Sequence, residues 1–166
     1  MEQSSVKILA ISDVPSELLW DESVRKRLEG IDLILSCGDL PKKYLEYLTN
    51  FTTAPILYVH GNHDGSYKES EPGGCICVDD QVYVWKGLRI MGLGGSIRYN
   101  CEETFQYTEK EMRRRMRRLW FKAHRAGGID LLLTHSPAAG LNDGNDRAHK
   151  GFACFNDLLE EYQPKW

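Results

Sequence analysis

The chain has 166 residues, 42% hydrophobic and 27% charged, and this length and composition predict one globular domain over residues 1–166 with a core of its own. They exclude a disordered, collagen-like or disulfide-stabilised mini-protein. The 21 basic and 24 acidic residues give a net charge of −3, so the chain as a whole has no positive excess to attract nucleic acid or an anionic membrane.

The sequence predicts a cytoplasmic protein without a membrane-spanning segment. No apolar run approaches the roughly 20 residues that cross a bilayer. The opening residues Met1–Ile11 have neither the basic start nor the small-residue cleavage site of a signal peptide. The cysteines are odd in number and show no Cys-x-x-Cys spacing, which favours a reducing compartment over a disulfide framework; they are Cys37, Cys75, Cys77, Cys101 and Cys154.

Strand and helix patterns alternate along most of the chain. Short apolar runs bounded by polar residues or Gly predict buried strands at Val6–Ile11, Asp32–Leu35, Pro55–Val59, Val82–Trp85, Leu88–Leu93 and Asp130–Thr134. Helical patterns cover Ser16–Leu28, Pro41–Phe51, Thr108–Ala126 and Phe152–Tyr162, with Ser16 and Thr108 as N-caps. The repeated alternation predicts an α/β domain, and the stretch 75–93, which has strands without helices, predicts an antiparallel or mixed portion.

The predicted helix at 108–126 carries five arginines within six positions. An apolar stripe lies at helical spacing along the same segment, formed by Met112, Met116, Leu119, Trp120 and Ala123. A solvated helix face therefore explains the arginines most simply. The alternative is a basic patch for an anionic substrate or a nucleic acid, which lacks the interleaved aromatic residues of such surfaces.

Four of the predicted strands are followed by side chains that can bind a metal ion. These residues are Asp13, Asp39 after Gly38, the run Asn62-His63-Asp64 after Gly61, and His135. Each residue alone is explained as a turn former or helix cap. In an open α/β sheet, however, ligands gather at the carboxyl ends of the strands, so four such residues are expected to meet in one site.

The chemistry of these side chains favours a catalytic metal site. Carboxylate and amide oxygens with imidazole nitrogens suit Mn²⁺, Fe or Zn²⁺ better than a thiolate site does. Two divalent ions about 4 Å apart would neutralise neighbouring carboxylates and stabilise the attacking and leaving oxygens of a phosphoryl displacement. The pattern therefore predicts metal-assisted hydrolysis.

Taken in order, these motifs resemble those of the calcineurin-like metallophosphoesterases, and the likeness spans almost the whole chain. The residues that carry it are Asp13, Gly38-Asp39, Gly61-Asn62-His63-Asp64 and Thr134-His135. The resemblance implies two facing β-sheets flanked by helices, with the site at one rim. It also implies that Asp39 bridges two metal ions, that Asp13 binds the first, and that Asn62 and His135 bind the second. His63 would act near the substrate as a proton donor or phosphate-binding group, together with Asn62.

Two departures from the family pattern weaken the implied metal sites. The family has Asp-x-His at the first motif, whereas here Pro15 follows Asp13 and Val14 and offers no donor. The family's last motif, Gly-His-x-His, does not occur before the sequence stops at Trp166. The resemblance therefore predicts a C-terminally truncated domain without the family's final strands, and either self-association that covers the exposed sheet edge or poor solubility.

Several other residues have simpler explanations. The Gly-rich run 92–96 resembles a loop of the family and is also explained as a turn. Arg98 beyond it is a candidate phosphate-binding residue or a surface ion pair. His149 is expected in solvent, and structural roles are expected for His60 and His124.

The sequence therefore predicts a metal-dependent phosphoesterase that acts on phosphate mono- or diesters of a small molecule or nucleotide, with no membrane partner. The alternative is a catalytically inactive scaffold of the same fold that binds a protein. A third class, a nucleic-acid enzyme that uses the arginine-rich helix, would show binding that weakens steeply with salt.

Overall fold

The computed structural model describes residues 5–21, 23–100 and 104–166. Its strands are β1 (Ile8–Ile11), β2 (Leu33–Ser36), β3 (Ile56–Tyr58), β4 (Cys75–Cys77), β5 (Gln81–Trp85), β6 (Leu88–Leu93), β7 (Ser96–Ile97), β8 (Gln106–Tyr107) and β9 (Leu131–Thr134). Its α-helices are α1 (Val24–Leu28), α2 (Lys42–Thr49), α3 (Glu109–Arg125) and α4 (Cys154–Tyr162), and two short 3₁₀ helices are η1 (Glu17–Leu19) and η2 (Asp64–Lys68).

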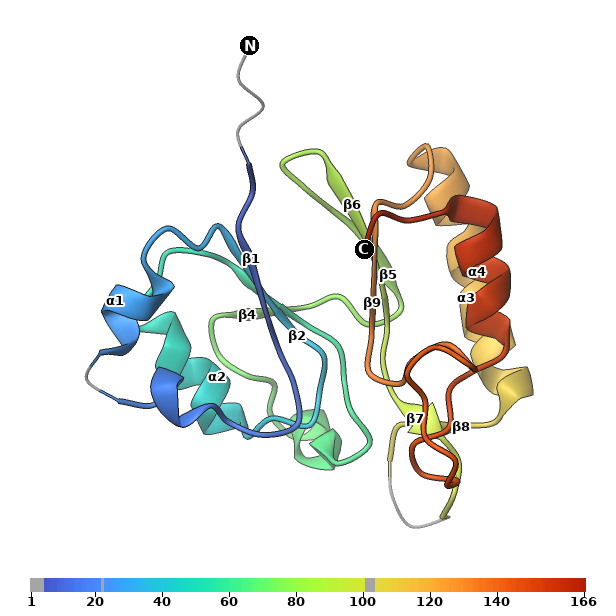
Figure 1. Ribbon diagram of the computed structural model, residues 1–166, viewed down its shortest axis with the longest axis horizontal. Coiled ribbons are helices and arrows are strands. Elements are labelled where there is room, and N and C mark those ends of the chain that lie inside the picture. Colours follow the sequence, from blue (N-terminus) through green and yellow to red (C-terminus); the bar gives the residue numbers. More distant parts are fainter. Residues whose placement is uncertain (1–4, 22, 101–103) are drawn as a thin grey trace.

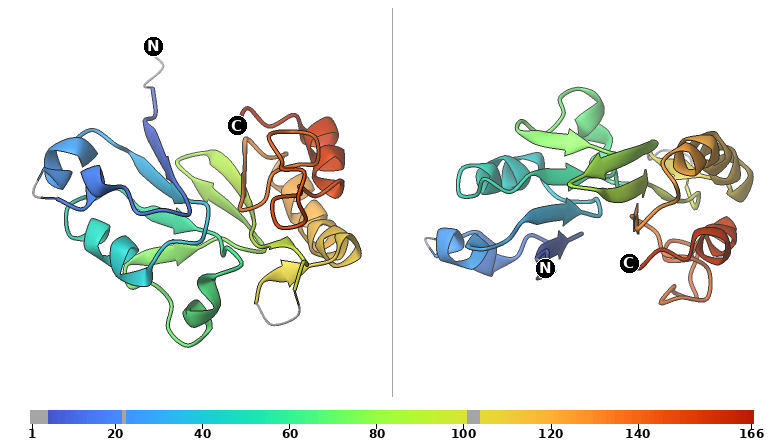
Figure 2. Two further views of the ribbon diagram at one scale, coloured as in Figure 1. Left: turned by 60° about the horizontal axis from the view of Figure 1, so that its bottom comes forward. Right: turned by 90° about the horizontal axis from the view of Figure 1, so that it is seen from above.

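Two sheets face each other at the centre of the molecule. The first has the order β1-β2-β3-β4, and all of its strands are parallel. The second has the order β5-β6-β9, in which β5 and β6 are antiparallel and β6 and β9 are parallel. The stretch 75–93, predicted to be antiparallel or mixed, is therefore divided: β5 and β6 form an antiparallel hairpin in the mixed sheet, whereas β4 belongs to the parallel sheet. Helices α1 and α2 cover the outer face of the first sheet, and α3 and α4 that of the second (Figures 1 and 2).

Three hydrophobic clusters hold these layers together. Between the two sheets, Leu33, Leu35, Leu57, Ile90 and Leu133 are among the buried residues. A second cluster joins the first sheet to α1 and α2, and a third joins the second sheet to α3 and α4. This arrangement confirms the predicted two-sheet sandwich flanked by helices.

The long helix α3 begins as the sequence predicts. The Thr108 hydroxyl accepts a hydrogen bond from the Glu111 backbone N–H, and the Glu111 carboxylate accepts one from the Thr108 N–H, which forms a capping box. Another acidic residue of the same turn, Glu109, accepts hydrogen bonds from the backbone N–H groups of Ala153 and Cys154, at the start of α4. Two carboxylates of one turn, Glu111 and Glu109, therefore accept backbone hydrogen bonds at the starts of α3 and α4, respectively.

The segment predicted as one helix at 16–28 is instead divided into η1 and α1. The Asp21 carboxylate accepts hydrogen bonds from the backbone N–H and the hydroxyl of Ser23, a local turn that competes with helical hydrogen bonding. The Ser16 side chain caps nothing, and its backbone N–H donates to the Tyr44 hydroxyl on α2. The prediction of a continuous, Ser16-capped helix was therefore wrong.

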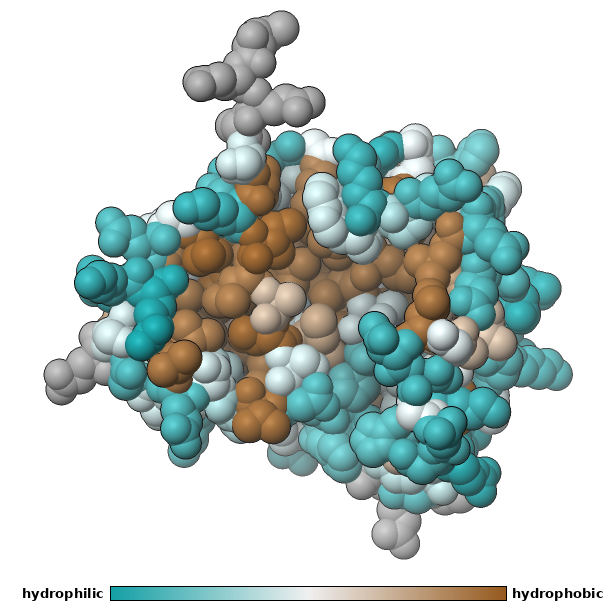
Figure 3. All heavy atoms as spheres, viewed as in Figure 1, coloured by the Kyte–Doolittle hydropathy of each residue, from teal (hydrophilic) through white to brown (hydrophobic). Residues whose placement is uncertain are grey.

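One face of the molecule carries a broad apolar band (Figure 3). The band runs over β1 and past β9 toward α4, and both of these strands lie at the edge of their sheet. Val6, just before β1, is 49% exposed. Among the described helices, none is both long enough and apolar enough to cross a bilayer. Cys37, Cys75, Cys77 and Cys154 are free thiols, while Cys101 lies outside the described residues.

Candidate metal centre

The structure brings together the four residues predicted to bind metal. They follow β1, β2, β3 and β9, and the carboxyl ends of β1, β2 and β9 all face the lower side of the molecule in Figure 1. One ligand atom from each of Asp13, Asp39 and His135 lies within 4.8 Å of the others. Asn62 Oδ1 is 3.1 Å from His135 Nε2, which is 3.4 Å from Asp39 Oδ2. Residues separated by up to 122 positions thus share one site because their strands end at the same rim.

Unusual backbone geometry aims the two carboxylates. Asp13 and Asp39 have φ angles of 60° and 57°, in the left-handed region that few residues other than Gly, Asn and Asp adopt. The Asp13 backbone N–H donates to the Gly38 carbonyl at 3.1 Å and joins the two turns. At Gly61, a Cβ atom would lie only 2.0 Å from Asp39 Oδ1. Glycine at this position therefore allows the loop after β3 to approach the Asp39 carboxylate.

A buried carboxylate, Asp64, links the loops after β2 and β3. Its Oδ2 atom accepts hydrogen bonds from the backbone N–H groups of Asp39, at 2.9 Å, and Gly61, at 2.8 Å. Burial raises the pKa of Asp64, although these two hydrogen bonds favour its ionised form. The His63 backbone N–H in turn donates to Asp39 Oδ1 at 2.7 Å. Asp39 is thus held from both its backbone and its side chain.

The hydrogen bonds of His135 show that the residues fit a cation. His135 Nδ1 lies 2.9 Å from the Cys37 carbonyl oxygen, which only accepts, so Nδ1 carries a proton. The other ring nitrogen, Nε2, faces two acceptor oxygens, Asn62 Oδ1 and Asp39 Oδ2, and in the unprotonated ring it is an acceptor as well. The Asn62 orientation is fixed because its Nδ2 donates to the Tyr99 hydroxyl at 3.1 Å. A divalent cation would satisfy all three acceptors, and this mixture of oxygen and imidazole ligands suits Mn²⁺, Fe or Zn²⁺.

The other predicted site residues lie in different surroundings. His63 is exposed beside Asn62. Pro15, at the family's histidine position, is half-buried and contributes no ligand. The Arg98 guanidinium donates to Glu111 at 2.9 Å and to the Gln106 carbonyl at 3.3 Å, as expected from the surface ion-pair interpretation. His149 is exposed and contacts Asp146.

A buried ionic network next to the site was not predicted from the sequence. Asp79 accepts hydrogen bonds from the Arg115 guanidinium at 2.6 Å and the Gly94 N–H at 2.8 Å, and it lies 2.8 Å from His60 Nδ1. Burial opposes ionisation of Asp79, but His60 and Arg115 outweigh it and lower its pKa. Arg115 is only 7% exposed, so the interpretation of all five arginines as a solvated face was wrong for this one.

This network holds the glycine-rich turn against the strand end that leads to Asn62. The His60 carbonyl accepts the Gly95 N–H at 2.7 Å, and a Cβ on Gly94 would lie 2.4 Å from the same oxygen. Arg115 also donates to the Gly94 carbonyl at 2.7 Å. Asp79 follows β4 as the predicted ligands follow their own strands, so the same strand-end rule could have found it. No comparable sequence pattern marks Tyr99 as a residue of the site.

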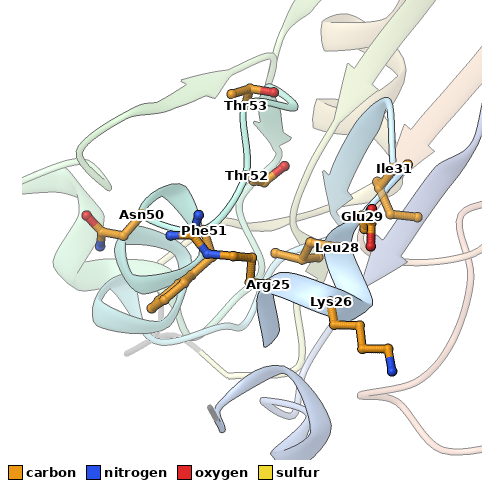
Figure 4. Close-up of a pocket in the computed structure, with 10 residues that line it drawn as sticks. Arg25, Lys26, Leu28, Glu29, Ile31, Asn50, Phe51, Thr52 and Thr53 are labelled. Atoms are coloured by element: carbon orange, nitrogen blue, oxygen red, sulfur yellow. The ribbon is translucent and has the colours of Figure 1, made fainter. Parts of the chain in front are cut away.

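A surface hollow lies away from this site. It has a volume of about 670 Å³ and is lined by residues that precede β2 and β3, including Glu29, Ile31 and Phe51 (Figure 4). Arg25 lies 6.0 Å from the centroid of the Phe51 ring. Because the hollow adjoins the amino-terminal ends of β2 and β3, it lies at the opposite end of these strands from the candidate metal ligands.

A two-sheet α/β sandwich with acidic, amide and imidazole ligands at its strand ends has the architecture of a metallophosphoesterase. The family model of the calcineurin-like phosphoesterase superfamily domain matches residues 6–159 of this chain. The chain therefore belongs to the calcineurin-like phosphoesterase superfamily, whose members are generally hydrolytic and typically bind divalent metals. A comparison with curated proteins finds no match.

Proposed function

We propose that this chain hydrolyses phosphate mono- or diesters with the help of a divalent cation held by Asp13, Asp39, Asn62 and His135. The observation that carries this proposal is the convergence of His135 Nε2, Asn62 Oδ1 and Asp39 Oδ2 at one sheet rim. A bound divalent cation would supply charge neutralisation and Lewis-acid polarisation of the phosphoryl group. Manganese is the ion to test first, and a cytoplasmic location remains a prediction.

Other residues of the chain position the candidate ligands and supply a group for proton transfer. Asp64 and the His63 backbone N–H hold the Asp39 carboxylate in one orientation. The Cys37 carbonyl fixes the His135 ring, and Tyr99 fixes the Asn62 amide. The exposed His63 imidazole gives a proton to the leaving oxygen or binds the phosphate. Direct attack by water is favoured over a covalent intermediate because the sequence has neither Asp-x-Asp nor Gly-x-Ser-x-Gly.

The test is hydrolysis of p-nitrophenyl phosphate and bis(p-nitrophenyl) phosphate with Mn²⁺. Asp39→Asn should lose both Mn²⁺ affinity and turnover, because it removes a charged ligand. His63→Ala should bind Mn²⁺ normally and lose about 10²–10⁴-fold in kcat, the usual contribution of a proton-transfer group. His149→Ala, a change at another exposed histidine, is the matched control and should leave both quantities unchanged.

A non-catalytic scaffold that binds a protein is the second candidate function. Pro15 favours it, because a residue without a donor stands at a family ligand position. The scaffold predicts no turnover with any metal in the wild-type protein. The enzyme predicts measurable turnover that Pro15→His increases. No turnover in either protein, together with no Mn²⁺ binding, would refute the catalytic proposal.

A further inference from the structure

Apolar side chains crowd the segment that follows the first candidate metal ligand. Val14, Leu18 and Trp20 are 77%, 56% and 45% exposed, although each is large and apolar. Exposed apolar residues scattered singly need no explanation, and Trp20 is the one of these three that also lines a hollow. The group begins directly after Asp13.

Beside this segment is an open hollow of about 350 Å³, lined by Pro15, Glu17, Trp20 and Pro41. Its volume is at the lower end of the range for small-molecule pockets, about 300–1,000 Å³, and is suited to a single ring system. Pro15 is two residues after Asp13, and Pro41 is two residues after Asp39. Two residues span at most about 7 Å, so both walls of the hollow start beside candidate metal ligands.

Stacked aromatic rings hold the Trp20 side of the hollow rigid. The Trp20 indole stacks on Tyr44 with centroids 4.9 Å apart and an interplanar angle of 7°, and on Tyr47 at 5.4 Å and 14°. Tyr44 is fully buried, and its hydroxyl accepts the Ser16 N–H at 3.3 Å. The aromatic surface and the loop after Asp13 are therefore fixed to the same helix, α2, so little conformational entropy is lost when a ring binds.

The charge of the hollow shows which part of a substrate it can take. Its lining includes one carboxylate, Glu17, and no cation. A phosphate would be repelled there, whereas an uncharged ring would bury apolar surface against Pro15, Pro41 and Trp20. The phosphate belongs at the metal centre, and the hollow lies beside that centre.

We infer that this hollow binds an aromatic group esterified to the phosphate, which makes the chain selective for aryl phosphoesters over small alkyl ones. The inference rests on the proposed function, because it takes the phosphate to lie at the metal centre. Tryptophan stacks on rings of many kinds, so the shared chemistry is a planar ring one ester link from phosphorus. Trp20 and the two prolines are specificity residues that take no part in the chemical step.

The test compares Mn²⁺-loaded binding of phenylphosphonate and methylphosphonate by calorimetry, since neither compound is hydrolysed. Wild type should bind phenylphosphonate about tenfold more tightly, equivalent to about 1.4 kcal/mol, which is within the range for one ring stacked on an aromatic side chain. Trp20→Ala should abolish that preference with methylphosphonate affinity unchanged, and Trp20→Phe should retain most of it. Trp120→Ala is the matched control, because Trp120 is 43% exposed and also stacks on a neighbour, His124.

Kinetics separate this inference from the proposed function. For monoesters followed by release of inorganic phosphate, Trp20→Ala should raise KM about tenfold for phenyl phosphate and leave KM for methyl phosphate and both kcat values unchanged. Equal wild-type affinities for the two phosphonates, or a preference that survives Trp20→Ala, would overturn the inference. Failure of the proposed function would appear instead as no Mn²⁺-dependent hydrolysis of any ester.

Discussion

Gly61→Ala tests whether close packing of the loop after β3 sets the position of Asp39. A Cβ atom at residue 61 would lie 2.0 Å from Asp39 Oδ1 and 2.6 Å from the Asp39 backbone nitrogen. Real Cβ contacts are essentially never shorter than 3.0 Å, so the Asp39 carboxylate must move by about 1 Å or more. The backbone offers little alternative, because Gly61 and Asp39 are both hydrogen-bonded to the same Asp64 oxygen.

A movement of this size is large for a metal ligand. Ligand distances are held within about 0.2 Å in working sites, and a 1 Å misplacement costs about 10²-fold in rate. We therefore expect Gly61→Ala to weaken Mn²⁺ binding about 10²-fold and to lower turnover at saturating Mn²⁺ by a similar factor. The fold should survive, because both collisions, with the carboxylate and with the backbone nitrogen of Asp39, fall at the rim and not in the core between the sheets.

Calorimetric Mn²⁺ titration and thermal unfolding of the metal-free protein measure the two effects separately. Gly73→Ala is the control, because its Cβ would meet the flexible Glu46 side chain at 3.3 Å, far from the candidate ligands in sequence. It should bind Mn²⁺ normally. Normal Mn²⁺ affinity in Gly61→Ala would refute the packing argument, whereas loss of the folded state without metal would show that Gly61 is needed for folding itself.

Further predictions concern stability, pH and association. Arg115→Met should destabilise the protein by about 3–5 kcal/mol in urea unfolding, because it leaves the Asp79 carboxylate buried without its cation; a change below 1 kcal/mol would contradict the role assigned to the network. Arg89 lowers the pKa of Asp130 from 3.8 to about 2 through a side-chain hydrogen bond, so this interaction stabilises the fold above pH 4 and is lost as pH falls toward 2. Asp130→Asn should therefore lower the free energy of unfolding by at most about 2 kcal/mol at pH 7 and by little at pH 2. A loss of stability that does not depend on pH would refute this role of the Arg89–Asp130 interaction. The edge strand β1 and the apolar band of Figure 3 predict concentration-dependent self-association in sedimentation velocity. Val6→Lys, a change at an exposed residue just before β1, should weaken this association. A wild-type protein that stays monomeric at high concentration would contradict the prediction.

Apolar runs and one capping signal predicted most of the fold because they are local. The buried runs that became β2, β3, β6 and β9 were recognisable without knowledge of their partners. Thr108 marked the start of α3 because the capping box uses residues three apart. The break between η1 and α1 was missed because the Asp21 turn and the stacking of Trp20 on α2 decide it. Helical periodicity in the sequence does not report such tertiary contacts.

The residues of the candidate site also divide into those that local sequence patterns predict and those whose roles depend on tertiary contacts. Asp13, Asp39, Asn62 and His135 were predicted because each follows a recognisable strand, and parallel strands end at one rim. Asp64 and Tyr99 act by hydrogen bonds to turns and to an amide, and their sequence positions give no sign of those partners. Arg115 was misassigned because one cation among five in a row looks like the others until its partner, Asp79, is known.

Crystals soaked in Mn²⁺ and measured at the manganese absorption edge would show whether Asp39, Asn62 and His135 hold a metal ion. We expect an anomalous peak within coordination distance of these residues, with the imidazole bound through Nε2 and Nδ1 still hydrogen-bonded to the Cys37 carbonyl. The same crystals of Asp39→Asn should show a peak that is much weaker or absent. A wild-type structure at millimolar Mn²⁺ with no peak among these side chains, or with its peak elsewhere, would refute the proposed metal centre.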